Sequence, residues 1–125
     1  MKSPRGFTLI ELLVVLAVLA LMVAVAYPRY AEHVDRAKEA ALKHNLLGVR
    51  DAIDKFHADR ARYPKDLPEL VEQRYLRALP VDPITERNDS WRLVPASAPA
   101  GSSGIVDLHS GATGRARTGE PYASW

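Results

Sequence analysis

The chain has 125 residues, no cysteine and a formal net charge of +2, from 17 Lys and Arg against 15 Asp and Glu. Without cysteine, disulfides and thiolate-type zinc sites are excluded. Lys2 and Arg5 supply the whole positive surplus, because the other 15 basic residues balance the 15 acidic ones. The basic charge is therefore poor evidence for a nucleic-acid partner, and we expect none.

A nearly unbroken apolar segment, residues 7–28, follows the basic N-terminus. As a helix, the roughly 21 residues from Phe7 to Tyr27 would measure about 31 Å, which matches the hydrocarbon thickness of a bilayer. Lys2 and Arg5 precede it and charges of both signs follow it, so we expect the N-terminus in the cytoplasm and the rest of the chain outside. Glu11 interrupts the segment, and an acid in mid-membrane costs about 2.5 to 3.5 kcal/mol, so it needs a partner or a shallow position.

The same segment permits a second interpretation as a secretory signal peptide. The small residues Ala24 and Ala26 flank Val25 as a cleavage site would require. The chain would then be a secreted binding module released after Ala26. Against this, the apolar stretch exceeds the usual length of about 7 to 15 residues, and Glu11 has no purpose in a discarded segment.

Gly6, Phe7, Thr8 and Glu11, at this spacing ahead of an apolar helix, resemble the class III signal of type IV pilins and type II secretion pseudopilins. The resemblance implies that a prepilin peptidase removes residues 1–6 by cutting after Gly6. It also implies methylation of the new amine on Phe7. Glu11 becomes the fifth residue of the mature chain.

Cleavage after Gly6 would give Glu11 a partner. The amine on Phe7 would be largely cationic at neutral pH, because the pKa of such a group lies near 8. Opposite charges about 4 Å apart gain about 4 kcal/mol at an effective dielectric of about 20, comparable with the cost of inserting the acid. If the amine belongs to a neighbouring subunit, the pair also sets the stagger between helices. The alternative is that Glu11 only reaches the membrane surface.

After the span we expect a kink at Pro28 and then an amphipathic helix over residues 29–62, ended by the Tyr63-Pro64 step. Its apolar positions recur every three or four residues: Tyr30, Val34, Ala37, Ala41, Leu42, Leu46, Val49, Ile53 and Phe56. The outer, solvated face is expected to carry Glu32, Arg36, Glu39, Lys43, Arg50 and Asp54. Gly48 is expected to mark close packing against a sheet.

Residues 63–89 form a proline-rich segment with a short helix expected over 67–75. This segment resembles the loop of the major pseudopilins of type II secretion, at Tyr63-Pro64, Leu67, Leu70-Val71, Tyr75-Leu76, Leu79-Pro80 and Asp82-Pro83. Residues 90–125 predict a small antiparallel sheet, with strands over 90–95 and 104–110, a flexible connection between them, and a last strand within 121–125. The apolar contacts expected on the long helix are Trp91, Ile105, Leu108 and Trp125.

No catalytic or metal-binding constellation stands out. The four histidines, His33, His44, His57 and His109, lack zinc-site spacing. Many major pseudopilins end in an acid-rich loop that binds calcium, and Asp107, Ser110 and Gly111 resemble its beginning. Calcium takes six to eight oxygens, however, and Glu120 is the single acid in residues 110–125. We therefore expect no metal, no cofactor and no enzymatic activity.

The predicted fold class is α+β: a long N-terminal transmembrane and amphipathic helix packed on a small C-terminal antiparallel sheet, as in pilins. The resemblance implies a structural subunit of a type II secretion pseudopilus, anchored in the inner membrane by one span and polymerised into a periplasmic fibre of identical subunits. Its implied partners are the prepilin peptidase, an assembly platform protein with its ATPase, and minor pseudopilins. A type IV pilin or DNA-uptake minor pilin is the alternative within the class.

Overall fold

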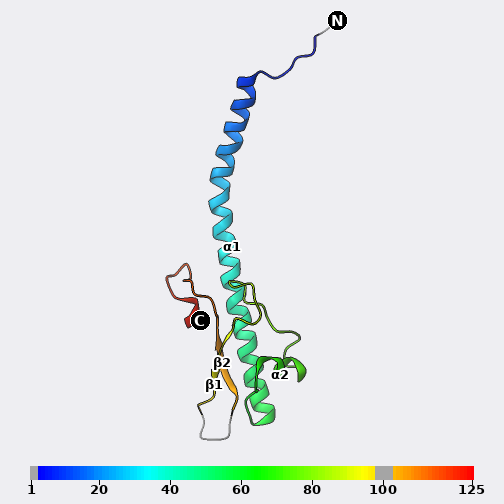
Figure 1. Ribbon diagram of the computed structural model, residues 1–125, viewed down its shortest axis with the longest axis vertical. Helices are drawn as coiled ribbons and strands as arrows, with labels where there is room; N and C mark the ends of the chain where they lie inside the picture. The colour runs from blue at the N-terminus through cyan, green and yellow to red at the C-terminus, as the bar shows by residue number, and fades with distance from the viewer. Residues whose placement is uncertain (1–2, 98–102) are drawn as a thin grey trace. The chain divides into compact units, whose positions relative to one another are not determined.

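A computed structural model describes residues 3–97 and 103–125. The chain forms two compact units, Met1–Arg36 and Ala37–Trp125, which we call the N-terminal unit and the head unit. The elements are helix α1 (Leu9–Arg60), helix α2 (Leu67–Glu72), strands β1 (Arg92–Pro95) and β2 (Ile105–His109), and a short 3₁₀ helix η1 (Tyr122–Ser124) (Figure 1). A long helix with a small antiparallel sheet confirms the predicted α+β class.

Helix α1 contains 52 residues and contributes to both units. Pro28 lies inside it, so the helix continues through the residue where we expect a kink, and the kink itself stays a prediction. The helix ends as predicted: Ala61 takes a left-handed φ of 54°, and its N–H donates to the carbonyl of His57 at 2.9 Å. Pro64 follows three residues later.

The core of the head unit is built on one stripe of α1. Its buried residues are Glu39, Leu42, Leu46, Val49, Ala52, Ile53 and Phe56. The prediction is confirmed from Leu42 onward, but it is wrong for Tyr30, Ala37 and Ala41, which are exposed. It is also wrong for Glu39, assigned to the solvated face. Glu39 continues the stripe three residues before Leu42, and its carboxylate is bonded there by the C-terminal segment.

Helix α2 follows a turn and covers part of the same core through Leu67 and Leu70. It begins where Asp66 caps it, accepting from the N–H of Glu69 at 2.9 Å. It ends at Glu72, three residues before the predicted end, and Arg74 then takes a left-handed φ of 64°. The short predicted helix is therefore present and one turn shorter than expected.

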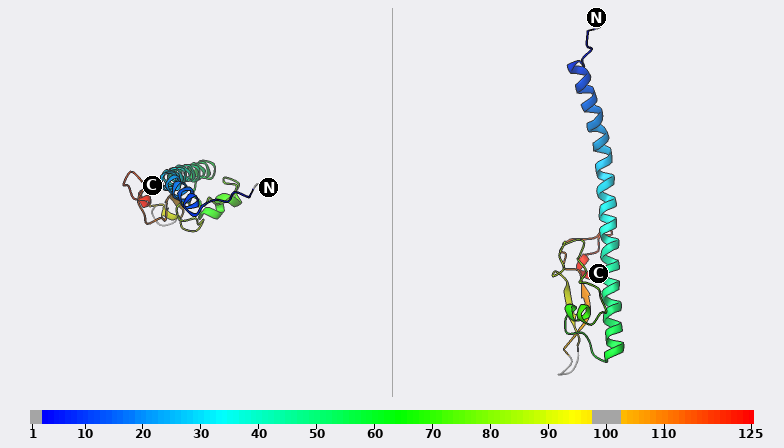
Figure 2. Two further views of the ribbon diagram at one scale, coloured as in Figure 1. Left: turned by 90° about the horizontal axis from the view of Figure 1, so that it is seen from above. Right: turned by 90° about the vertical axis from the view of Figure 1, so that its right-hand side faces the viewer.

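Strands β1 and β2 pair antiparallel and run beside the C-terminal half of α1 (Figures 1 and 2). Leu93 lies opposite Leu108, and a bulge at Val94/Pro95 shifts the register. The predicted contacts are confirmed, because Trp91, Ile105 and Leu108 are buried in the core and Trp125 packs against it. Of the flexible connection expected between the strands, residues 98–102 lie outside the described residues.

The predicted last strand is wrong. Residues Tyr122–Ser124 form the 3₁₀ helix η1, in which the N–H of Ser124 donates to Pro121 at 3.1 Å and the N–H of Trp125 to Tyr122 at 3.0 Å. Pro121 has no N–H to offer a sheet, and these local bonds use the donors that a third strand would need.

The glycines in the head unit have different roles. Gly48 is exposed on α1, and a Cβ at this position would meet nothing within 4 Å, so the prediction that it packs against the sheet is wrong. Gly111 is the tight position instead, because a Cβ there would lie 1.8 Å from the carbonyl oxygen of Ser90. Only glycine allows the two backbones to approach this closely.

Candidate assembly site

Gly6 and Phe7 lie just before α1 in a segment without regular secondary structure, and both are exposed. Phe7 is 84% exposed, the highest value among the large apolar residues that the structure describes. A peptidase needs access to the scissile bond, and the residues on both sides of the Gly6–Phe7 bond are exposed and outside the helix. The structure thus places both predicted cleavage residues in one accessible segment.

Thr8 caps the N-terminus of α1. Its hydroxyl accepts from the N–H of Glu11 at 3.2 Å, and its carbonyl accepts from Leu12 at 3.2 Å. Thr8 and Glu11 thus have the spacing of a capping box, Ser/Thr-x-x-Glu, a signal that our sequence reasoning missed. Glu11 lies in the first helical turn, where the helix dipole favours an acid. The acid therefore has a local role in addition to the predicted pairing.

The carboxylate of Glu11 is exposed in the single chain. Among residues 3–97 and 103–125, the ion pairs do not include it. The structure therefore brings Gly6, Phe7 and Glu11 into one short segment but leaves the acid available to a group from outside the chain.

Residues 7–30 are exposed on every side of the N-terminal unit. This surface includes an 18-residue stretch of α1 that is long and apolar enough to cross a membrane, none of it buried. Removing apolar surface from water gains about 25 cal/mol per Å², so exposure of this whole surface to water is unfavourable. The segment therefore requires lipid or neighbouring apolar helices. Tyr27 and Tyr30, both 70% exposed, follow at its end, as aromatic residues do at membrane interfaces.

In the head unit, Glu39 is a buried charged residue and the first buried position along α1. Its Oε1 accepts from the backbone N–H of Arg117 at 2.9 Å and from the Tyr122 hydroxyl at 3.2 Å, and its Oε2 accepts from Nε of Arg117 at 3.4 Å. The Arg117 N–H lowers the pKa of the Glu39 carboxyl below its ordinary value, against the rise caused by burial, with the Tyr122 hydroxyl and the Arg117 charge adding to the lowering. Glu39 is therefore held as an anion.

A second ion pair ties α1 to β2. Arg50 donates through Nε to Asp107 at 2.6 Å and through Nη2 to the carbonyl of Leu108 at 2.9 Å. Burial raises the pKa of Asp107, but hydrogen bonds from Arg50 and the Leu108 N–H, together with the positive charge of Arg50, hold it below the ordinary value. Arg50, expected on the solvated face, thus belongs to the packing of the sheet.

Asp82 is fully buried and joins two turns of the head unit. Its Oδ1 accepts from the N–H of Ile84 at 2.8 Å, and its Oδ2 accepts from the Ser110 hydroxyl at 2.5 Å. The same Ser110 oxygen accepts from the N–H of Ala112 at 3.1 Å. Asp82 and Ser110, both within the stretches that resemble pseudopilins, therefore have a structural role.

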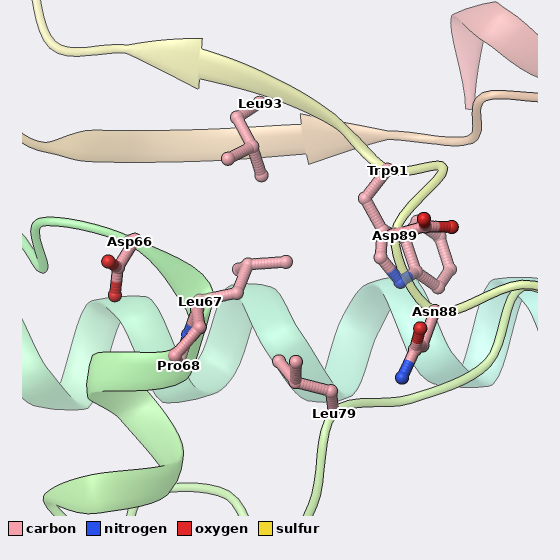
Figure 3. A pocket seen from close by; sticks show the side chains of 8 residues that line it. All are labelled: Asp66, Leu67, Pro68, Leu79, Asn88, Asp89, Trp91 and Leu93. Atoms are coloured by element: carbon pink, nitrogen blue, oxygen red, sulfur yellow. The ribbon is translucent and has the colours of Figure 1, made fainter.

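An apolar groove lies between α2 and β1 (Figure 3). Its lining residues are Asp66, Leu67, Pro68, Leu79, Asn88, Asp89, Trp91 and Leu93. The indole N–H of Trp91 donates to Pro80 at 2.9 Å, Asp66 caps α2 and Asp89 pairs with Arg87. These eight residues include no nucleophile with an adjacent base, so the groove offers apolar contact and not catalysis.

Within the part of the chain that the structure describes, no group of three or more His, Cys, Asp or Glu is placed to hold a metal ion. His57 stacks on Tyr63 with ring centroids 4.1 Å apart, and Nδ1 of His109 lies 2.6 Å from the carbonyl oxygen of Trp125. His33 and His44 are exposed on α1. The histidines are therefore not gathered at one site: His33 belongs to the N-terminal unit and the other three to the head unit.

Comparison with known proteins identifies the family. A model of the prokaryotic N-terminal methylation motif matches residues 1–27. Type II secretion system core protein G of Pseudomonas aeruginosa is 31% identical over 91% of this chain and 87% of its own length. The chain belongs to the core protein G family of type II secretion systems. The Klebsiella pneumoniae core protein G is 28% identical over 100% of this chain and 96% of its own length.

Type IV pilins match a shorter part of the chain. The major pilin PilA of Myxococcus xanthus is 37% identical over 47% of the chain and 27% of its own length. No solved structure matches the chain. The relatives are named as core protein G of type II secretion systems and as type IV pilins, and their likeness supports a structural protein.

Proposed function

We propose that this chain is a structural subunit of a type II secretion pseudopilus, made as a membrane-anchored precursor and polymerised into a periplasmic fibre that supports protein export. The observation that carries the proposal is the N-terminal segment. It joins an exposed Gly6–Phe7 bond, a capped helix start with a single acid, and a fully exposed apolar surface. The coverage of core protein G relatives across the head unit supports a pseudopilin over a type IV pilin.

In this function, prepilin peptidase cuts after Gly6 and the new amine of Phe7 is methylated. The precursor spans the inner membrane once with its N-terminus in the cytoplasm, and the head unit is periplasmic. During assembly the apolar surface moves from lipid to neighbouring copies, and Glu11 pairs with the amine of an adjacent subunit. An assembly platform protein, its ATPase and minor pseudopilins complete the set of partners that the family resemblance implies.

Intact-mass measurement of the chain, produced in a bacterium with a complete secretion system, tests the proposal. We expect a product that begins at methylated Phe7. A product that begins at Tyr27 would instead support the secreted binding module, and a precursor that keeps Met1 would contradict processing altogether.

The Gly6→Leu variant tests the cleavage position. A Cβ at Gly6 meets nothing within 4 Å, so the substitution leaves the fold unchanged and acts on the peptidase alone. We expect full-size precursor in the membrane and no fibres. Gly48→Ala is the matched control, because Gly48 is equally open but far from the cut, and it should be processed normally. Mature-size Gly6→Leu protein would show that the cleavage assignment is wrong.

A further inference from the structure

The C-terminal segment, residues 110–125, does not suit calcium. Glu120 is its single acid and is exposed, whereas calcium sites combine several carboxylates among six to eight oxygens. Arg115 donates to the carbonyl of Gly119 at 2.9 Å, so a guanidinium already engages a backbone oxygen of this turn. The cations of the segment would also repel a metal ion. The residues present therefore do not fit the calcium that the family resemblance implies.

The segment contributes Ala112, Ala116 and Tyr122 to the core. Contacts other than a bound metal ion must therefore keep it in place. Local backbone bonds shape it: the N–H of Ala116 donates to Glu120 at 2.7 Å and the N–H of Tyr122 to Gly114 at 3.1 Å. These bonds close the turn upon itself but do not attach it to α1. Attachment requires contacts with the helix.

Glu39 supplies that attachment. Its two carboxylate oxygens take three hydrogen bonds from residues 78 and 83 positions later in the chain, at Arg117 and Tyr122. Only 8% of Glu39 is exposed, so its charge depends on these donors. Charged hydrogen bonds are stronger than neutral ones, and a buried carboxylate that loses its donors bears the full cost of its desolvation.

The polarity of this contact is opposite to that of a calcium loop. In a calcium loop the segment contributes anions and the cation comes from solution. Here the segment contributes the donors, including a cation at Arg117, and α1 contributes the anion. A second cationic contact extends the attachment, since Nζ of Lys43 lies 4.5 Å from the centre of the Trp125 ring.

We infer that Glu39 is the positioning residue that fixes the C-terminal segment of this chain to α1, in a metal-independent replacement for a calcium loop. The inference rests on the contacts of Glu39 and on the donor set of residues 110–125. It does not depend on processing or fibre assembly, so its failure would leave the proposed function untouched.

Limited trypsin digestion of the full-length chain in detergent micelles tests the inference, because trypsin cuts after Arg115 and Arg117. We expect Glu39→Ala to be cut there roughly tenfold faster than wild type or more, since the segment opens without its anchor. Asp54→Ala is the matched control: it removes an exposed acid from the same helix and should be cut at the wild-type rate. Cutting of Glu39→Ala at the wild-type rate would overturn the inference.

Tyr122→Phe provides a milder variant in case Glu39→Ala does not fold. It keeps the ring, which packs edge-on against Trp125 with centroids 5.3 Å apart, and removes the hydroxyl that donates to Glu39. We expect a smaller acceleration of cutting, and in the Glu39→Ala background the substitution should add little. Equal effects of Tyr122→Phe in both backgrounds would show that Glu39 is not its partner.

Thermal melting of the wild-type chain with calcium chloride or with a chelator tests the metal-independence directly. We expect the same melting temperature in both, and the same trypsin pattern. A rise with calcium that the chelator reverses would overturn the inference, because a metal would then hold the segment.

Discussion

The two units of the chain differ in where their apolar surface goes. The head unit buries its large apolar residues against one another, from Leu42 and Phe56 on α1 to Leu108 on β2. In the N-terminal unit, by contrast, the Leu, Ile, Val and Met side chains of residues 9–25 are all exposed. One helix therefore combines a self-sufficient half with a half that needs an external apolar partner. The stability of the head unit and the assembly of the N-terminal unit should then respond to different substitutions.

The largest expected effect separates assembly from folding. Glu11→Leu makes the apolar surface continuous, so membrane insertion and cleavage after Gly6 should persist. It removes the partner of the Phe7 amine, so mature protein should accumulate in the membrane and fibres should be lost. An immunoblot for mature protein and a count of sheared fibres measure the two outcomes. The melting of the head unit should not change.

Glu11→Gln distinguishes pairing from helix capping. Glutamine serves in a capping box as glutamate does, so this variant keeps the local role of Glu11 and loses only its charge. We expect it to fail in assembly as Glu11→Leu does, whereas Thr8→Ala, which loses the cap at a cost of about 1 kcal/mol, should retain fibres. Wild-type fibre numbers in Glu11→Gln would show that capping, or simple exposure at the membrane surface, explains the acid.

The next effect falls on the head unit alone. In Gly111→Ala the new Cβ would lie 1.8 Å from the Ser90 carbonyl oxygen, so the backbones must separate. We expect a loss of stability at or above the about 1 to 3 kcal/mol typical of overpacking, measured by thermal melting in detergent. Gly114→Ala is the control, because its Cβ would be 3.6 Å from the Tyr122 ring, an ordinary contact. Equal melting of the two variants would contradict the close approach.

A smaller effect depends on pH. The pKa of Asp107 in the folded chain lies below its ordinary value of 3.8, so the Arg50–Asp107 pair stabilises the head unit above that pH and loses this contribution as the pH falls through the folded value. Both side chains are about one-third exposed, so Arg50→Gln should cost about 1 kcal/mol or less at neutral pH.

The difference between wild type and Arg50→Gln should shrink as the solution is acidified below about pH 4. Chemical denaturation at a series of pH values measures it. Glu39 and Glu69, whose pKa values are also lowered, do not contact Arg50 or Asp107 and respond equally in both proteins, so they cancel in the difference. A difference that stays constant through the acid range would show that Arg50 acts by packing alone.

The sequence predicted whatever depends on local pattern. The apolar run, the period of the stripe from Leu42 to Phe56 and the Tyr63-Pro64 stop are all local, and the helix, its core face and its end follow from them. The positions that it missed depend on distant partners. Nothing near Glu39 announces donors 78 and 83 residues away, although its place on the stripe, three residues before Leu42, was a signal. The η1 turn was missed for a different reason, because the bonds that replace the predicted strand are local to residues 121–125.

In the candidate assembly site, too, local signals in the sequence could be found, and a contact with another chain could not be tested. Gly6, Phe7 and Glu11 were found from their spacing, because a peptidase reads a short linear segment. The cap on Thr8 had an equally local signal, Thr-x-x-Glu, and was missed because the apolar run was interpreted as a membrane span alone. The pairing of Glu11 involves another copy of the chain, so it stays a prediction.

The smallest effect tests whether the head-unit part of α1 is independent of neighbouring copies. Gly48 is exposed in the interior of the helix, where glycine costs about 1 kcal/mol relative to alanine, and a Cβ there meets nothing within 4 Å. Gly48→Ala should therefore raise the free energy of unfolding of the head unit by up to about 1 kcal/mol, measured by chemical denaturation of the chain in detergent micelles. A less stable variant would contradict the open space that the structure shows beside Gly48. If the variant is more stable yet forms fewer fibres, the space beside Gly48 is used by a neighbouring copy, and the head unit too would depend on assembly.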